Sequence, residues 1–168
     1  MSESKASRVM TSGMMSSLSD EWETPQRLFD ILNAEFNFRT DVCATVDNAK
    51  CSHFYTKDQN GLDQQWSGVC WMNPPYGREI VKWVKKAFES SESPDRGGGK
   101  CIVVCLLPAR TDTKWWQNYI MQASEIRFIS GRVRFGDAPS SAPFPSAIAI
   151  FGTPRVPTIS RMVLTDGT

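Results

Sequence analysis

The sequence predicts one α/β domain with a mostly parallel central sheet and flanking helices. Apolar runs of strand length alternate along the chain with segments whose apolar residues recur at helical spacing. Residues 101–108 (CIVVCLLP) form the clearest run, continuous in the way that strands buried on both faces are. The length of 168 residues fits a single domain that buries most of its surface.

A helix should begin near residue 25, where apolar residues start to recur at helical spacing. Thr24 suits its N-cap and Pro25 its first helical position. The same kind of pattern predicts strands over residues 36–44, 68–72, 125–129 and 147–151, and helices over residues 78–91 and 113–122. Because the strand over 68–72 runs directly into Asn73, this residue should lie at the carboxyl end of a buried strand.

We expect three segments along the chain: a flexible leader over residues 1–19, the folded domain over 20–152, and a loosely ordered tail over 153–168. The first segment is rich in Ser and Met, without periodicity and without the apolar core of a signal peptide. No stretch reaches the roughly 18 apolar residues of a membrane span. We therefore expect a cytoplasmic protein with no membrane partner.

Charge and cysteine content narrow the classes of function. Nineteen Lys and Arg residues stand against eighteen Asp and Glu residues, so the net charge of +1 gives no general attraction to a polyanion. Any nucleic-acid contact has to come from a local patch. The five cysteines are odd in number and favour a reducing compartment. Cys43, Cys51 and His53 lack the paired spacing of a zinc site, so we predict no metal.

The segment Asn73-Pro74-Pro75-Tyr76 carries the chemistry that the sequence suggests. An exocyclic amine on an aromatic base is a poor nucleophile because its lone pair is delocalised into the ring. Two acceptors on the amine hydrogens, the Asn73 side-chain oxygen and the Pro74 carbonyl, would return that lone pair to the nitrogen. The two prolines stiffen the turn, and Tyr76 could stack on a base pulled out of a duplex. The alternative is a rigid turn in which Tyr76 covers the core.

Eight sequence blocks, in their order and spacing, carry a resemblance to a known family: DEWETP (20–25), TDVCAT (40–45), NAKC (48–51), GLDQQW (61–66), WMNPPYG (71–77), LLPARTDTKWW (106–116), SGRVRFG (130–136) and FPSAIAIF (144–151). Together they resemble the phage-type DNA N-6-adenine-methyltransferase (Dam) family. The resemblance implies a Rossmann-like class I methyltransferase domain, S-adenosylmethionine as methyl donor, and adenine in double-stranded DNA as acceptor. GATC is the target sequence that the likeness to Dam enzymes suggests.

The resemblance also implies where the donor binds. Thr24 and Pro25 look like the first donor-binding element, in which a helix N-terminus suits the methionine carboxylate. Trp22 would cover either the adenosyl group or the core. The other residues that the resemblance suggests are Asp41 and Ala44 near the methionine moiety, and Asp58, with Leu62 beside it, near the adenine ring.

The chain departs from larger methyltransferases in this region. Asp63 competes with Asp58 for the contact to the adenine ring. No glycine-rich F-x-G-x-G stretch precedes Asp41, and about seventeen residues separate Asp41 from Asp58, too few for a full crossover helix and strand. The acid that binds the donor ribose is therefore not assigned, with Asp47 and Asn48 as substitutes.

Basic residues interleaved with aromatic ones predict the DNA contacts. Such a mixture suits phosphate contact and the reading of base edges. The residues concerned are Arg110, Lys114, Trp115, Arg132, Arg134 and Phe135. The alternative is that neighbouring rings belong to the core and the arginines to a solvated face. Since 168 residues leave no room for a separate target-recognition domain, the loops around 110–116 and 130–146 would read the DNA, aided by a second subunit or the N-terminal arm.

Two other classes of function remain open at this stage. The hydrogen-bond chemistry of residues 73–76 also serves cytosine N4, an RNA adenine or a protein glutamine. A DNA-binding module could keep the fold without catalysis. The sequence does not decide between a monomer and a homodimer.

Overall fold

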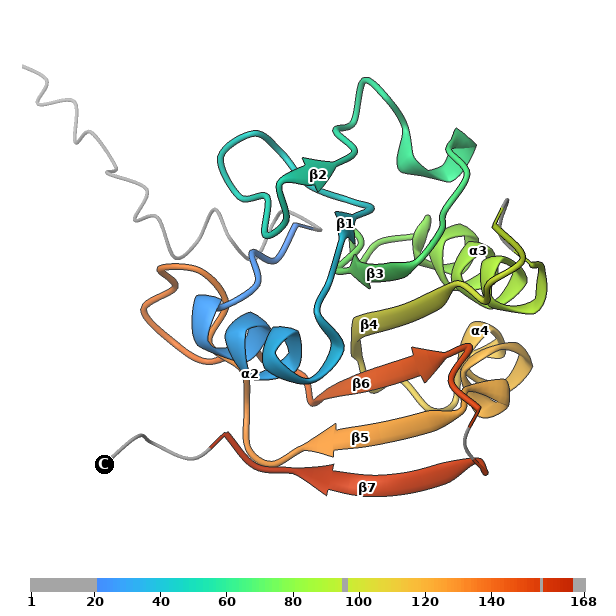
Figure 1. Ribbon diagram of the computed structural model, residues 1–168. Helices are drawn as coiled ribbons and strands as arrows, with labels where there is room; N and C mark the ends of the chain where they lie inside the picture. The colour runs from blue at the N-terminus through green and yellow to red at the C-terminus, as the bar shows by residue number, and fades with distance from the viewer. Residues whose placement is uncertain (1–20, 95–96, 155, 165–168) are drawn as a thin grey trace, which may run out of the picture.

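A mixed sheet organises the chain. The structure is a computed structural model that describes residues 21–94, 97–154 and 156–164, so the leader expected over residues 1–19 lies outside the described residues. Within them, seven strands lie in the order β2-β1-β3-β4-β6-β5-β7 (Figure 1). The strands are β1 Thr40–Asp41, β2 His53–Phe54, β3 Val69–Met72, β4 Ile102–Pro108, β5 Glu125–Ile129, β6 Ser146–Phe151 and β7 Thr158–Met162.

Strand direction divides the sheet into two parts. Strands β2, β1, β3 and β4 are parallel neighbours. β6 runs antiparallel to β4 and β5, and β7 is parallel to β5. The predicted α/β sheet with flanking helices and a parallel core is confirmed, although the sheet is mixed because β6 reverses direction.

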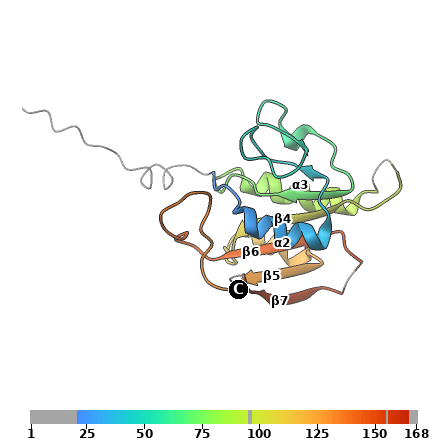
Figure 2. The ribbon, with the colours of Figure 1, turned by 60° about the vertical axis from the view of Figure 1, so that its left-hand side comes forward.

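Helices cover both faces of the sheet (Figure 2). They are α2 Gln26–Phe36, α3 Ile80–Glu92 and α4 Lys114–Asn118, with 3₁₀ turns η1 Gly61–Asp63 and η2 Ile120–Gln122.

Phe29 of α2 contacts Trp71 of β3, with ring centroids 5.7 Å apart. Phe88 of α3 contacts Phe151 of β6 at 6.3 Å. The register pairs Trp71 with Val104, and Val103 with Phe151. Because successive residues of a strand point to opposite faces, α2 and α3 pack on opposite faces.

The start of α2 differs from the sequence expectation. Pro25, and not Thr24, is the N-cap residue, and no side chain caps the helix there. The Thr24 hydroxyl instead accepts a hydrogen bond from Asn73. A tertiary partner has therefore displaced the local capping bond that the sequence suggests.

The predicted strand over residues 36–44 is also shorter than expected. α2 continues through Phe36, and Asn37 ends it in the left-handed conformation with φ 54°. Asparagine tolerates this conformation at a helix C-terminus. Only Thr40–Asp41 then remains as β1.

Two further elements differ from their predictions. The helix predicted over residues 113–122 is divided at Tyr119 into α4 and η2. The loosely ordered tail predicted over residues 153–168 contains β7, which pairs with β5 over five residues. The side chains of β7 are mostly exposed, so the strand shows no hydrophobic pattern that sequence reasoning could use.

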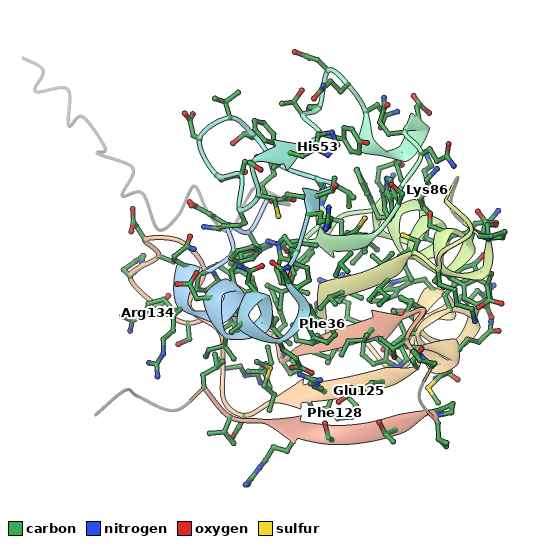
Figure 3. All side chains as sticks on the ribbon, in the orientation of Figure 1. Phe36, His53, Lys86, Glu125, Phe128 and Arg134 are labelled. Atoms are coloured by element: carbon green, nitrogen blue, oxygen red, sulfur yellow. The ribbon has the colours of Figure 1, made fainter. Side chains whose placement is uncertain are left out.

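An ion-pair cluster ties the end of α2 to β5. Arg127 donates from its two terminal guanidinium nitrogens to the Glu35 carboxylate at 2.6 and 2.7 Å, and from Nε to Glu125 at 2.7 Å. Its guanidinium also lies 5.5 Å from the ring centroid of Phe36, a residue labelled with Glu125 in Figure 3. These hydrogen bonds raise the pKa of Arg127.

No helix in the described part of the chain is long and apolar enough to cross a membrane.

Two glycines with the same backbone conformation test how closely the sheet packs. Gly152 has φ 85° and Gly98 has φ 77°. A Cβ at Gly152 would lie 2.2 Å from the Cys101 carbonyl oxygen, whereas one at Gly98 would meet nothing within 4 Å. Both alanine variants incur the left-handed penalty of about 1–2 kcal/mol. We expect Gly152→Ala to lower the free energy of unfolding by roughly 2 kcal/mol more than Gly98→Ala, measured by urea denaturation. Equal losses would contradict the close approach.

Candidate active site

A cavity of about 780 Å³ lies at the carboxyl ends of β1, β2 and β3. β2 lies on one side of β1 and β3 on the other, so the chain changes direction across the sheet at this point. Open α/β sheets bind ligands at such a switch point. Seven predicted site residues line the cavity: Trp22, Thr24, Ala44, Leu62, Asn73, Pro74 and Pro75. A smaller hollow of about 370 Å³ between η1 and α3 contains none of the residues 73–76.

Asn73 directly follows β3, as the sequence predicts. Its side-chain nitrogen Nδ2 donates to the Trp22 carbonyl oxygen and, at 2.9 Å, to Thr24 Oγ1. Both acceptors belong to the segment before α2, about fifty residues away in the chain. The Trp22 carbonyl can only accept, so this contact determines which end of the amide is nitrogen and which is oxygen.

The Asn73 oxygen is the exception among buried polar atoms of the site. Oδ1 is buried and has no hydrogen-bond partner among the described residues. Leaving a buried acceptor unsatisfied costs roughly 1–3 kcal/mol. Among the described residues Ser146 Oγ and Thr153 Oγ1 are also buried without a partner, but neither residue lines the cavity. The site therefore holds an unused acceptor at the end of β3.

Tyr76 packs in the core, which is the alternative that the sequence left open. Its side chain is 3% exposed, and its hydroxyl donates to the Leu106 carbonyl oxygen at 3.1 Å. The ring lies edge-on to Phe135 and Phe144, with centroids 6.0 and 5.7 Å apart. Burial raises the pKa of the Tyr76 hydroxyl well above its usual value. In this structure the ring has no open face on which a base could stack.

Trp22 joins the same aromatic cluster and also lines the cavity. Its ring lies edge-on to Phe135 at 5.4 Å and to Phe144 at 5.0 Å. The backbone continues this contact, because the Gly136 amide donates to the Glu23 carbonyl oxygen at 2.9 Å. The segment before α2 is thereby joined to the loop over residues 130–145, which Figure 1 shows beside it.

Asp41 supports the cavity wall and does not line the cavity. Its side chain is 3% exposed, and its carboxylate accepts from the backbone amides of Cys43 at 3.3 Å and Lys50 at 3.0 Å. Burial raises the pKa of Asp41 from 3.8 to about 6. The carboxylate thus closes the loop that carries the cavity residues Cys43, Ala44, Thr45 and Asn48.

Cys43 lines the cavity and carries a thiol, a group that can act as a nucleophile. Burial, with the nearby Asp41 carboxylate, raises the pKa of its thiol to about 12. A thiol with such a pKa stays protonated at neutral pH and is a poor nucleophile. The cavity therefore does not favour covalent catalysis by a cysteine.

The structure does not bring Asp58 to the cavity. Asp58 and its competitor Asp63 are both exposed, and Asp63 accepts a hydrogen bond from Asn60 at 2.7 Å. The cavity wall here is formed by Asn60, Gly61 and Leu62. A Cβ at Gly61 would lie 2.0 Å from the Val42 carbonyl oxygen, so only glycine lets η1 approach β1 this closely. Pro25, a predicted donor contact, also lies outside the cavity lining.

Sequence reasoning missed several cavity residues: Glu21, Tyr55, Lys57, Asn60, Gly61, Glu79 and Trp83. Tyr55 and Lys57 follow β2, a two-residue strand that no pattern predicted. Trp83 lies on the buried side of α3, in the helix predicted over residues 78–91. The position of Tyr55 and Lys57 after a strand parallel to β1 is visible only in the structure, because two residues give no strand pattern in the sequence.

The residues predicted to contact DNA fall into two groups, exposed cations and buried aromatic rings. Arg110, Lys114, Arg132 and Arg134 are exposed, and Arg134 projects outward from its loop in Figure 3. Trp115 and Phe135 are 8% and 3% exposed and belong to the core. Their burial disagrees with the expectation that these rings contact DNA, because the same apolar character also suits core packing.

The burial of Tyr76 gives a stability prediction. We expect Tyr76→Ala to lower the free energy of unfolding by about 3–5 kcal/mol, the usual cost of truncating a buried aromatic ring. Tyr76→Phe should cost about 1 kcal/mol, because it removes only the hydrogen bond to Leu106. Urea denaturation of both variants measures these values. An alanine variant as stable as the parent protein, but much less active, would show that the ring acts on a ligand instead.

The raised pKa of Asp41 gives a pH prediction. Between pH 3.8 and about 6 the folded protein holds a proton that the unfolded chain has lost. Stability should therefore fall as pH rises through this window and stay level above it. Asp41→Asn has no such ionisation. Relative to this variant, the parent protein should lose roughly 2–3 kcal/mol of stability between pH 4 and pH 7. A difference between the two proteins that does not change with pH would contradict the burial of a titrating carboxyl.

The chain is similar to known proteins over most of its length. The sequence model of the family described as DNA N-6-adenine-methyltransferase (Dam) matches residues 11–152. A protein of Haemophilus phage HP1 (strain HP1c1) named DNA N-6-adenine-methyltransferase is 36% identical over 114 residues, which cover 66% of this chain and 62% of that protein. A protein of Escherichia phage T1 with the same name is 32% identical over 113 residues, which cover 66% of this chain and 44% of that protein. The matched part is thus less than two thirds of each relative.

A solved structure shares the fold. The modification subunit of a presumed type I restriction enzyme from Vibrio vulnificus YJ016 superposes with a TM-score of 0.51 at 10% identity, over 88% of this chain and 48% of that one. At this identity the likeness concerns the fold alone, a Rossmann-like methyltransferase architecture. With the family match extending over residues 11–152, the chain belongs to the DNA N-6-adenine-methyltransferase (Dam) family.

Proposed function

We propose that this protein transfers a methyl group from S-adenosylmethionine to the N6 amine of adenine in DNA. The observation that carries the proposal is the unpartnered acceptor Asn73 Oδ1, on an amide whose nitrogen is already held by two oxygens. The choice of adenine N6 as the amine, and of DNA as the nucleic acid, is supported by the relatives named DNA N-6-adenine-methyltransferase.

The chemistry follows from what an acceptor does to an aromatic amine. A hydrogen bond from the amine to Oδ1 favours a pyramidal nitrogen, whose lone pair is then available for attack. The carbonyl of Pro74, the next residue in the chain, is the proposed second acceptor. The methylated nitrogen carries a positive charge and loses one proton to water, and no residue has to form a covalent bond to the base.

The target has to enter a covered site. Asn73 lines the cavity, but its Oδ1 atom is buried. An incoming amine must therefore displace atoms that cover this oxygen. A base inside a duplex cannot reach such an atom, so the adenine has to leave the stack. Since Tyr76 is buried, a half-buried ring, Trp22 or Phe144, is the better candidate to contact the extruded base.

The cavity suits the proposed donor in size and chemistry. Its volume of about 780 Å³ lies in the range of small-molecule sites. The rings of Trp22, Tyr55 and Trp83 provide apolar surface for an adenine. Lys57 and Glu21 provide charges for a carboxylate and an ammonium group. When bound, S-adenosylmethionine supplies an electrophilic methyl group on its sulfonium.

The proposed DNA surface consists of the exposed cations Arg110, Lys114, Arg132 and Arg134. The net charge is only +1, so phosphate contact needs a local group of cations, and these four side chains are the ones that we propose. Arg132 and Arg134 belong to the loop that packs on Trp22, and this places them beside the segment that holds Asn73.

Substitution of Asn73 tests the catalytic assignment. We expect Asn73→Ala to reduce methyl transfer to DNA by about 100-fold or more, because it removes an acceptor that acts mainly in the transition state. Donor affinity, measured by calorimetry, should change little. Asn33→Ala is the matched control, since the Asn33 side chain accepts from the Phe38 amide and Asn33 does not line the cavity. Turnover of Asn73→Ala within a few-fold of the parent protein would contradict the proposal.

The assay also separates the alternative acceptors. Labelled methyl transfer is measured on DNA, RNA and protein, and the modified base in DNA is identified as N6-methyladenine or N4-methylcytosine. Sequencing of methylated DNA from cells that make the protein would then report the target sequence and test the hypothesis of GATC. Donor binding without transfer to any of these acceptors would favour a non-catalytic DNA-binding module.

A further inference from the structure

The hydroxyl of Thr24 is the second oxygen that holds the catalytic amide. We infer that Thr24 is a positioning residue, which with the Trp22 carbonyl fixes the Asn73 side chain so that only Oδ1 remains for the target amine. The inference rests on the proposed function. It differs from the role that the resemblance implies for Thr24, a contact to the donor.

The geometry uses the full donor capacity of the amide. An asparagine side chain has two N–H groups, and Asn73 directs them to two oxygens, the Trp22 carbonyl and Thr24 Oγ1. Thr24 is 4% exposed, so water does not compete freely for its oxygen. With both N–H groups engaged, the unpartnered Oδ1 is the remaining polar atom of the side chain.

The same contacts oppose rotation of the amide. A half-turn about the side-chain bond would place Oδ1 against the Trp22 carbonyl oxygen, which can only accept, and turn the N–H groups toward the target. Two oxygens in contact without a hydrogen between them repel each other. An amide that presented N–H groups could not accept from an amine. The Trp22 carbonyl therefore selects the catalytic orientation of Asn73, and the Thr24 hydroxyl helps to hold the amide in it.

The segment that supplies the two oxygens is itself held at both ends. Trp22 packs edge-on against Phe135 and Phe144, and the Glu23 carbonyl accepts from Gly136. On the other side, α2 begins at Gln26 directly after Pro25, whose φ is −60°. A segment anchored at both ends can hold the Asn73 side chain with the positional precision that catalysis requires.

Three variants separate the positioning role from a donor contact. Thr24→Val keeps the shape of the side chain and removes the acceptor. Thr24→Ser keeps the acceptor and removes a methyl group. Thr40→Val is the matched control, because the Thr40 hydroxyl is also buried and bonded to a side chain, His53 at 3.0 Å, but does not line the cavity. Melting temperatures are measured for all three.

We expect Thr24→Val to lower kcat by about 5- to 10-fold, the loss of one hydrogen bond that acts on the reacting geometry. KM and the calorimetric Kd for S-adenosylmethionine should stay within about 2-fold. Thr24→Ser should restore most of the turnover, and Thr40→Val should leave it unchanged. A Thr24→Val variant with normal kcat but raised donor Kd would show that Thr24 serves the donor, and would overturn the inference.

A measurement without turnover tests the same contact. The side-chain amide signals of Asn73, assigned by their loss in Asn73→Ala, are followed by NMR in the donor-free protein. Thr24→Val should shift these signals, whereas Thr24→Ser and Thr40→Val should not. Unshifted signals in Thr24→Val would overturn the inference even if that variant were inactive. If the parent protein methylates no DNA, RNA or protein, the proposed function fails, and the NMR result still decides whether Thr24 holds the amide.

Discussion

The hydrogen-bonding state of one amide connects the fold to the proposed chemistry. Asn73 directs its nitrogen to two oxygens of a segment about fifty residues earlier and keeps its own oxygen unpartnered. Asn73 follows β3, which pairs in parallel with β1, the strand that follows α2, so the fold brings the two segments to the same edge of the sheet. This arrangement also needs the loop over residues 130–145 to hold Trp22 through Phe135 and Phe144. The unsatisfied acceptor destabilises the folded protein by roughly 1–3 kcal/mol, a cost that a catalytic role would explain.

Several elements could be predicted from the sequence because burial dictates their residues. β4 is a continuous apolar run, β5 was predicted with the bounds it has, and β3 leads into Asn73 as expected. The position of Asn73 at a strand end follows from that pattern. The role of Tyr76 could not be predicted, since a tyrosine after a buried strand can stack on a ligand or pack in the core. The contact that decides, its hydroxyl on Leu106, comes from a strand thirty residues away. The burial of Trp115 and Phe135, which the sequence expects to contact DNA, is likewise visible only in the structure.

Other parts of the structure have no signal in the local sequence pattern. β2 has two residues, so the cavity residues that follow it, Tyr55 and Lys57, carried no strand signal. β7 is an exposed edge strand without alternation. Thr24 shows a different limit, because a threonine before a helix is a good N-cap by local rules, yet its oxygen serves Asn73. Such departures from local preference are expected at functional sites. The buried carboxyl of Asp41, which supports the cavity loop while its pKa is raised, is a second example.

The central claim is that Asn73 Oδ1 accepts a hydrogen bond from the amine that is methylated. The most direct measurement is a crystal structure of the protein with an unreactive donor analogue and a DNA duplex that contains the target adenine. We expect the adenine outside the helix stack, its N6 atom about 2.7–3.2 Å from Asn73 Oδ1. The Asn73 nitrogen should remain on Trp22 and Thr24. An adenine bound at the cavity with its N6 atom on other acceptors, or an Asn73 amide rotated so that Nδ2 points to the base, would contradict the account.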